Sequence, residues 1–252
     1  MCILVLAWQL LPECPLILLN NRDEFRARPT APLSPWPEGL VAGRDLQAGG
    51  TWLGLHPATR RWAVVTNVRE LPPPAGLGAR SRGGLVTDFL TGALSPGAFA
   101  RQIDLQAYTG FNLLLGDATQ AWSVSNRTGL IQPLPPGLYG LSNAALDTPW
   151  PKVERLRQRT VQEVLPLYQQ GRLADARAAA LTVLQDHQRP DDAQLPHTGV
   201  GLDTERLLSS VWIDSPAYGT WSSSVVELGV SGWFFQEKIH PLQQLAQCEG
   251  AF

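Results

Sequence analysis

A chain of 252 residues is long enough to bury a substantial core and lies near the upper end of the size range for one domain, so we expect a single domain over residues 1–252. Its apolar fraction of 44% and charged fraction of 17% are typical of a globular protein and exclude a largely disordered chain. The formal net charge of −2 offers no basic surface for nucleic acid or for anionic lipid, so we expect neither partner.

The first hundred or so residues are predicted to begin with β-strands and to end with two short helices. Residues 28–39 are proline-rich and are expected to be irregular. Serines that can cap a helix open the two short helices, at residues 81–92 and 95–103. Apolar runs bounded by turn residues predict strands at residues 3–9, 16–19 and 62–67 and a hairpin within residues 42–54.

The remainder of the chain is predicted to form strands, then helices, then strands again. Thr148 can cap a helix that begins at Pro149, Pro166 should kink it, and a second helix is expected at residues 173–185. Because strands and helices do not alternate one by one, the order favours an α+β protein with antiparallel sheets. The strands expected here are residues 111–115, 120–125, 130–134, 138–143, 209–213, 221–228 and 233–237.

Cys2 is the main candidate for a reactive residue. Removal of Met1 would make Cys2 the N-terminus, with an α-amine that titrates at roughly 7.7–8.0 and a thiol that titrates near 8.5. One residue would then supply a nucleophile together with the base that takes its proton. The alternative is a cysteine that only packs in an apolar first strand.

Charged residues follow the second apolar run, where the strand would bring them close to Cys2. Arg22 near the thiol would favour the thiolate, and Asp23 could hold the α-ammonium group. Asn67 and Asn143 end two further apolar runs, and their side-chain amides could stabilise an oxyanion. The alternatives are a surface ion-pair cluster at residues 20–24 and two asparagines that bind their own turns.

Other catalytic classes lack their sequence patterns. There is no Gly-x-Ser-x-Gly elbow of a serine hydrolase, and the four histidines form no pair at ligand spacing: His56, His187, His197 and His240. We therefore expect no metal site and no cofactor. Three cysteines are too few for a disulfide framework, and no apolar run reaches the roughly 20 residues of a membrane-spanning helix. A cytoplasmic protein without membrane insertion is expected.

An ordered set of motifs resembles the NRDE family, whose eukaryotic members are called transport-and-Golgi-organisation proteins. The resemblance extends from Cys2 to about Leu228, and the ordered set is more specific than any one motif. The motifs are Met1-Cys2, Asn21-Arg22-Asp23-Glu24-Phe25 with Arg28-Pro29-Thr30, Ala42-Gly43-Arg44-Asp45, Gly49-Gly50-Thr51-Trp52-Leu53-Gly54, Thr66-Asn67, Ser81-Arg82-Gly83, Phe111-Asn112-Leu113-Leu114, Leu141-Ser142-Asn143 and Pro149-Trp150-Pro151-Lys152-Val153.

The resemblance implies a four-layer αββα sandwich of two antiparallel sheets flanked by helices, as in N-terminal-nucleophile (Ntn) hydrolases that act as cysteine amidases. It implies Cys2 as the nucleophile, with Arg22 and Asp23 beside it. Asn67 and Asn143 become candidates for the oxyanion or the substrate amide. The residues expected to contact substrate are Asn21, Glu24, Trp52 and Trp221.

Trp221 is a departure from the family pattern. Members of the family usually read Gly-Thr-Arg-Ser-Ser where this chain has Gly219-Thr220-Trp221-Ser222-Ser223. An indole offers one donor and a large apolar face in place of a fixed cation. We expect Trp221 to border the Cys2 pocket, and either to favour an apolar ligand or to weaken hydrolysis.

Two functions follow as expectations from the resemblance. The first is an Ntn-type amidase or acylase that cleaves an amide or related acyl bond of a small molecule through Cys2. The second is a carrier or trafficking protein for haem or a lipid on the same fold, because transport-and-Golgi-organisation proteins have been linked to haem trafficking and lipid homeostasis. Retention of Met1 would exclude the self-activating nucleophile, and a haem titration would test the carrier.

Overall fold

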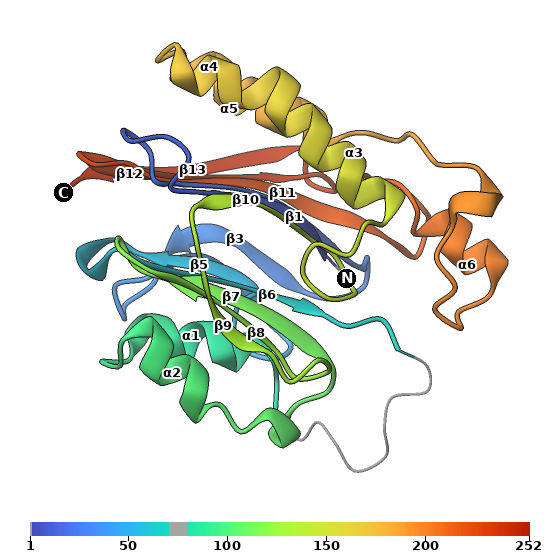
Figure 1. The fold of residues 1–252 in the computed structure, drawn as a ribbon, viewed down its shortest axis with the longest axis horizontal. Coiled ribbons are helices and arrows are strands. Elements are labelled where there is room, and N and C mark those ends of the chain that lie inside the picture. Colours follow the sequence, from blue (N-terminus) through green and yellow to red (C-terminus); the bar gives the residue numbers. More distant parts are fainter. Residues whose placement is uncertain (1, 71–79) are drawn as a thin grey trace.

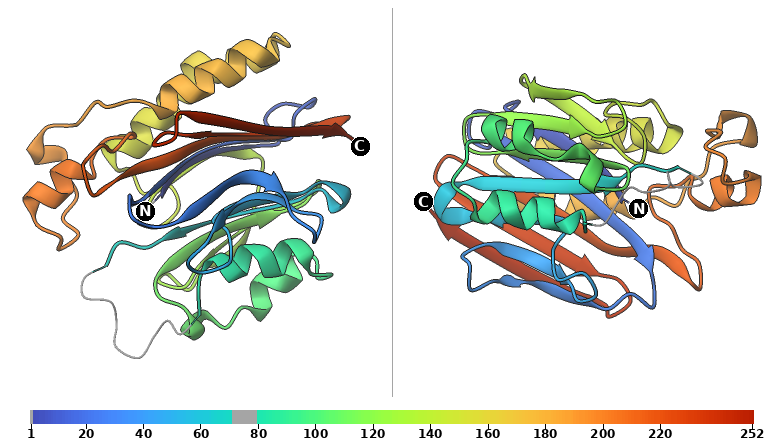
Figure 2. Two further views of the ribbon diagram at one scale, coloured as in Figure 1. Left: turned by 180° about the vertical axis from the view of Figure 1, so that it is seen from behind. Right: turned by 90° about the horizontal axis from the view of Figure 1, so that it is seen from below.

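The computed structural model describes residues 2–70 and 80–252, which form four stacked layers (Figure 1). Two antiparallel β-sheets lie face to face, and helices cover the outer face of each sheet, as the views in Figure 2 also show. The predicted α+β class and the αββα sandwich of two antiparallel sheets are confirmed.

The first sheet carries the N-terminal hairpin in its middle. Its strand order is β10, β1, β2, β11, β12 and β13. Leu4, Leu6 and Trp8 of β1 pack between the sheets, whereas the alternating Ile3 and Val5 pack under the helices. Burial on both faces explains the unbroken apolar run. The strands are β1 (Cys2–Trp8), β2 (Leu16–Phe25), β10 (Gly137–Leu141), β11 (Tyr218–Leu228), β12 (Gly232–Ile239) and β13 (Gln244–Ala251).

The second sheet follows the chain order from β3 to β9. Helices α1 (Gly83–Thr91) and α2 (Pro96–Gln102) cover it, and Ser95 caps α2 by accepting a hydrogen bond from the Ala98 amide, as its sequence position predicts. The strands are β3 (Thr30–Pro35), β4 (Val41–Asp45), β5 (Leu53–His56), β6 (Arg61–Asn67), β7 (Phe111–Gly116), β8 (Ala121–Ser125) and β9 (Ile131–Leu134), with short 3₁₀ turns at Pro57–Thr59 and Leu105–Ala107.

A helical layer lies over the outer face of the first sheet. Helix α3 (Pro151–Arg159) leads into a π-helical turn, Thr160–Val164, and then into α4 (Leu165–Gln169) and α5 (Leu173–Leu184). The π turn lies just before Pro166, which cannot donate the hydrogen bond that a regular α-helix needs, so the predicted kink has a visible cause. No helix within the described ranges is long and apolar enough to span a membrane.

Several sequence predictions about individual elements are wrong, among them the helix start, which is Pro151 with Trp150 as the N-cap residue and not Pro149 with Thr148. Residues 209–213 are not a strand, because Val211 O accepts from the Asn21 side chain and Trp212 O accepts from Ser210 Oγ, which leaves no ladder of backbone bonds to another strand. Residues 30–35 form edge strand β3, which tolerates its prolines because one side of an edge strand needs no donors. The largely exposed β13 was not predicted, and neither were the 3₁₀ turn Asp192–Gln194 and helix α6 (Leu202–Leu207).

Candidate functional site

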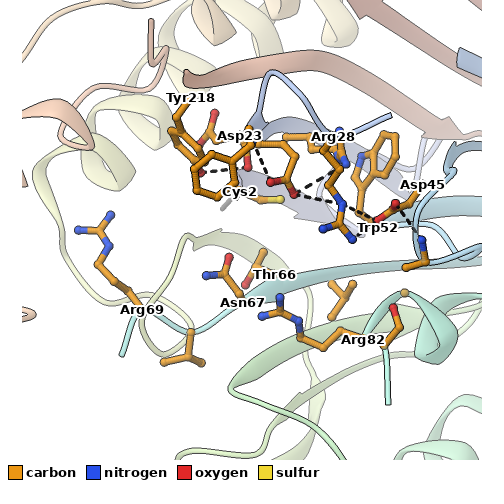
Figure 3. Close-up of a pocket in the computed structure, with 18 of the residues that line it drawn as sticks. Cys2, Asp23, Arg28, Asp45, Trp52, Thr66, Asn67, Arg69, Arg82 and Tyr218 are labelled. Carbon is orange, nitrogen blue, oxygen red and sulfur yellow. Dashed lines mark hydrogen bonds and ion pairs between the residues drawn. The ribbon is translucent and has the colours of Figure 1, made fainter. Parts of the chain in front are cut away.

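A cavity of about 700 Å³ lies at the end of the sandwich where β1 begins (Figure 3). Its wall comes from the start of β1, the end of β2, the loop between β4 and β5, the end of β6, the start of α1, helix α6 and the start of β11. This volume lies within the usual range for small-molecule sites. Strand ends from both sheets therefore bring distant parts of the sequence to one site.

Cys2 is the first residue of β1 and faces this cavity. It pairs in register with Arg22 of β2, and directly paired residues of antiparallel strands place their side chains on the same face. The Cys2 side chain is 7% exposed, and burial raises the pKa of its thiol. The charge of Asp23 also raises this pKa, whereas that of Arg22 lowers it.

Arg22 lies between the two sheets beside Cys2. Its guanidinium group is 4.3 Å from the centre of the Trp52 ring, and Nη1 donates a hydrogen bond to Thr30 Oγ1 at 3.0 Å. The carboxylate of Glu24 lies 3.8 Å from Nη2, and burial lowers the pKa of Arg22. Arg22, Glu24 and Trp52 all line the cavity, so these three predicted site residues lie together with Cys2.

Asp23 is fully buried, follows Arg22 on β2 and lines the same cavity as Cys2. It accepts a hydrogen bond from Thr220 Oγ1 at 2.8 Å. Burial raises the pKa of Asp23, and the charge of Lys152 from helix α3 lowers it. Burial in turn lowers the pKa of Lys152 to about 8, and Lys152 Nζ has no hydrogen-bond partner among the described residues.

Asn67 lines the cavity at the end of β6, and Asn143 lies behind it. The Asn143 side-chain amide donates to the backbone carbonyl and to Oδ1 of Asn67, both at 3.0 Å. These bonds orient Asn67 so that its own NH₂ group, which has no partner within residues 2–70 and 80–252, remains available (Figure 3). Of the two predicted amides, Asn67 is the one placed to meet a ligand.

Asn21 and Trp221 do not line the cavity. Asn21 faces the helical layer, where its amide donates to Leu184 O at 2.7 Å and to Val211 O at 3.0 Å. Trp221 is the extra residue of a β-bulge in the pairing of β11 with β2, and its indole nitrogen is buried. The structure therefore gives Asn21 a packing environment and places Trp221 outside the cavity wall.

Charged side chains at the rim form ion pairs with one another. Arg28 binds Asp45 at 2.7 Å, and Arg127 binds Glu70 at 2.6 Å with both carboxylate oxygens engaged. The Arg127 hydrogen bonds lower the pKa of Glu70. These pairs leave little net charge at the rim.

Three cationic residues at or near the cavity were not singled out from the sequence. Arg69 lines the wall, binds Glu205 at 2.6 Å and lies over the Trp150 ring. Arg82 lines the opposite side, at the start of α1, and Lys152 lies beneath Asp23. Arg82 and Lys152 belong to motifs of the family resemblance, but their positions along the sequence do not indicate that they lie near Cys2 in the fold.

Comparison with known proteins identifies the family. The family model described as "Transport and Golgi organisation 2" matches residues 1–235. The human "Transport and Golgi organization protein 2 homolog" is 33% identical over 239 residues, which cover 86% of this chain and 83% of the relative. The bovine homolog is 34% identical over 241 residues with the same coverage, and the Drosophila melanogaster protein is 27% identical over 237 residues, covering 84% and 81%. The chain belongs to the Transport and Golgi organisation 2 family, in agreement with its resemblance to NRDE proteins.

Proposed function

We propose that this chain is an N-terminal-cysteine hydrolase that cleaves an amide or related acyl bond of a small molecule through Cys2. The observation that carries the proposal is the position of Cys2, at the free end of a buried strand and facing a cavity between two sheets. A nucleophile placed there meets a ligand that enters between the strand ends. Asn67 supplies an unpaired amide donor, and Arg22 supplies a cation beside the sulfur.

The chemistry uses groups of this chain and one water molecule. Once Met1 is removed, the Cys2 α-amine takes the thiol proton and the sulfur attacks the substrate carbonyl carbon. The Asn67 amide donates to the oxyanion, and the amine leaves with the proton that the α-amine held. Water then attacks the thioester, which releases the acid and restores the thiol. Asn143 acts through Asn67, by fixing the orientation of its amide.

A second candidate is a non-catalytic carrier of a small ligand, such as haem or a lipid. One observation favours it: Cys2 is buried, and burial raises the pKa of its thiol and so disfavours the nucleophilic thiolate. A binding function needs the cavity but not the thiolate. The free cysteines Cys2, Cys14 and Cys248 fit a reducing compartment such as the cytoplasm for either function.

The test is labelling with an acylating amide probe after mass spectrometry has established the N-terminal residue. The hydrolase predicts loss of Met1, acylation at Cys2, and no acylation of Cys2→Ala. Cys248→Ala is the matched control, because Cys248 lies on β13 outside the cavity and should label like the parent protein. Retained Met1 with no acylation, together with saturable binding in a haem titration, would instead support the carrier.

A further inference from the structure

Arg82 differs from the other arginines that line the Cys2 cavity. Arg28 and Arg69 each have a carboxylate within 3 Å, and Arg22 has Glu24 at 3.8 Å. Arg82 has no carboxylate partner within 4.0 Å in the described parts of the chain. Its one hydrogen bond there runs from Nη1 to the backbone carbonyl of Gly110 at 3.1 Å. Most of its donors therefore have no partner among residues 2–70 and 80–252.

A close backbone contact between Gly50 and Gly83 fixes the position of Arg82. A Cβ atom on Gly50 would lie 2.8 Å from the carbonyl carbon of Gly83, and one on Gly83 would lie 3.1 Å from Thr51 O. Only glycines allow the loop after β4 to lie this close to the start of α1. Arg82 immediately precedes that start, so the contact holds its backbone in the cavity wall, and the bond to Gly110 O holds one end of its guanidinium group.

The guanidinium group of Arg82 extends toward Asn67, on the side of the cavity across from Cys2 (Figure 3). Burial lowers the pKa of Arg82. An arginine stays charged in spite of burial, so a half-buried, unpaired guanidinium group is costly unless an anion joins it. Arginine also presents a planar set of donors that fits a carboxylate with two parallel hydrogen bonds.

We propose that the ligand of the Cys2 cavity carries a carboxylate group, and that Arg82 binds this carboxylate while the rest of the ligand faces Cys2. For the hydrolase, the substrate class becomes an acyl compound with a free carboxylate away from the scissile bond. The substrate class rests on the proposed function, but the anion site itself does not, because it needs only the cavity.

The test measures the reaction of Cys2 with two maleimides that differ in charge. N-maleoylglycine carries a carboxylate, and its carboxamide is neutral and of the same size. The second-order rate constant for each is followed by mass spectrometry of the Cys2 peptide, in the full-length protein. The acid-to-amide rate ratio at Cys2 is expected to exceed the ratio for free cysteine. In Arg82→Gln this ratio should fall about tenfold, which corresponds to about 1.4 kcal/mol.

Arg80→Gln is the matched control, because Arg80 is exposed, pairs with Asp88 and does not line the cavity. It loses the same charge two positions away and should keep the parent ratio. Equal slowing of both maleimides in Arg82→Gln would show that Arg82 acts on the sulfur, and would overturn the proposal. A parent ratio no higher than that of free cysteine would also overturn it, even if Arg82→Gln did not fold.

The result is independent of amide cleavage, since a maleimide reacts with a thiol whether or not Met1 is removed. A charge-selective Cys2 that is never acylated would support the anion site and reject the hydrolase. An acylated Cys2 without charge selectivity would support the hydrolase and reject the anion site.

Discussion

Replacement of Asn21 by alanine should destabilise the fold without removing a ligand contact. Asn21 is fully buried and makes three hydrogen bonds on the helix-covered face of the first sheet. Its amide donates to Leu184 O and Val211 O, and its Oδ1 accepts from Ser223 Oγ at 2.6 Å. Asn21→Ala leaves two buried carbonyls without a donor, while Ser223 keeps its contact with His240.

Each orphaned buried polar group costs roughly 1–3 kcal/mol, so two of them should lower the unfolding free energy by roughly 2–6 kcal/mol. That is a large part of the roughly 5–15 kcal/mol that stabilises a typical domain. Urea unfolding followed by tryptophan fluorescence measures it. Asn67→Ala is the control, because Asn143 keeps the Asn67 backbone carbonyl as an acceptor, and a loss below about 1 kcal/mol is expected. A loss below about 1 kcal/mol for Asn21→Ala would refute the packing role.

Two further predictions concern the glycine contact and the pH dependence of stability. Gly50→Ala should push the start of α1 away and lower the acid-to-amide ratio at Cys2. Gly49→Ala is the control: its Cβ would meet open space, and its φ of +79° should cost only roughly 1–2 kcal/mol of stability. Equal acid-to-amide ratios in Gly50→Ala and Gly49→Ala would contradict the prediction. Burial lowers the pKa of His240 to about 3 in the folded protein, whereas the pKa of a histidine in the unfolded chain is about 6.5. Between these two pH values the unfolded chain binds a proton at His240 and the folded protein does not. Unfolding free energy should therefore fall as the pH decreases from about 6.5, and an equal decrease in His240→Gln would argue against this assignment.

The sequence predicts the layers of this fold better than its edges. The apolar run of β1 and the helical spacing after Thr148 belong to buried elements, where periodicity reports burial directly. Strands β3 and β13 lie at sheet edges and are partly exposed, so their composition carries little of that signal. Residues 209–213 are buried without pairing, and an apolar run alone cannot separate that state from a strand.

The predicted site residues that lie together in the structure are those that strand register places side by side. Cys2 and Arg22 come together because the first hairpin pairs them. The same two-residue alternation places the Asn21 side chain under the helical layer, whereas Asp23, the next residue after Arg22, still lines the cavity. The bulge at Trp221 breaks this alternation, and no local pattern reveals it. Arg82 depends on a contact between distant glycines, which spacing along the chain cannot show.

The hydrogen bonds around Asn143 limit how the cavity can change its size. The segment after β10, in the first sheet, is tied to the end of β6, in the second. Thr66 Oγ1 donates to Ser142 O, the Asn143 side chain donates to Asn67, and the Arg69 amide donates to Asn143 O at 2.7 Å. Ser142 Oγ also donates to the carbonyl of Cys2, which extends the seam to the start of β1. A bulkier ligand cannot enter by spreading the sheets without breaking this seam. Tolerance for ligand size must therefore come from the part of the wall that α6 supplies, because moving this short helix breaks the Arg69–Glu205 ion pair but neither sheet.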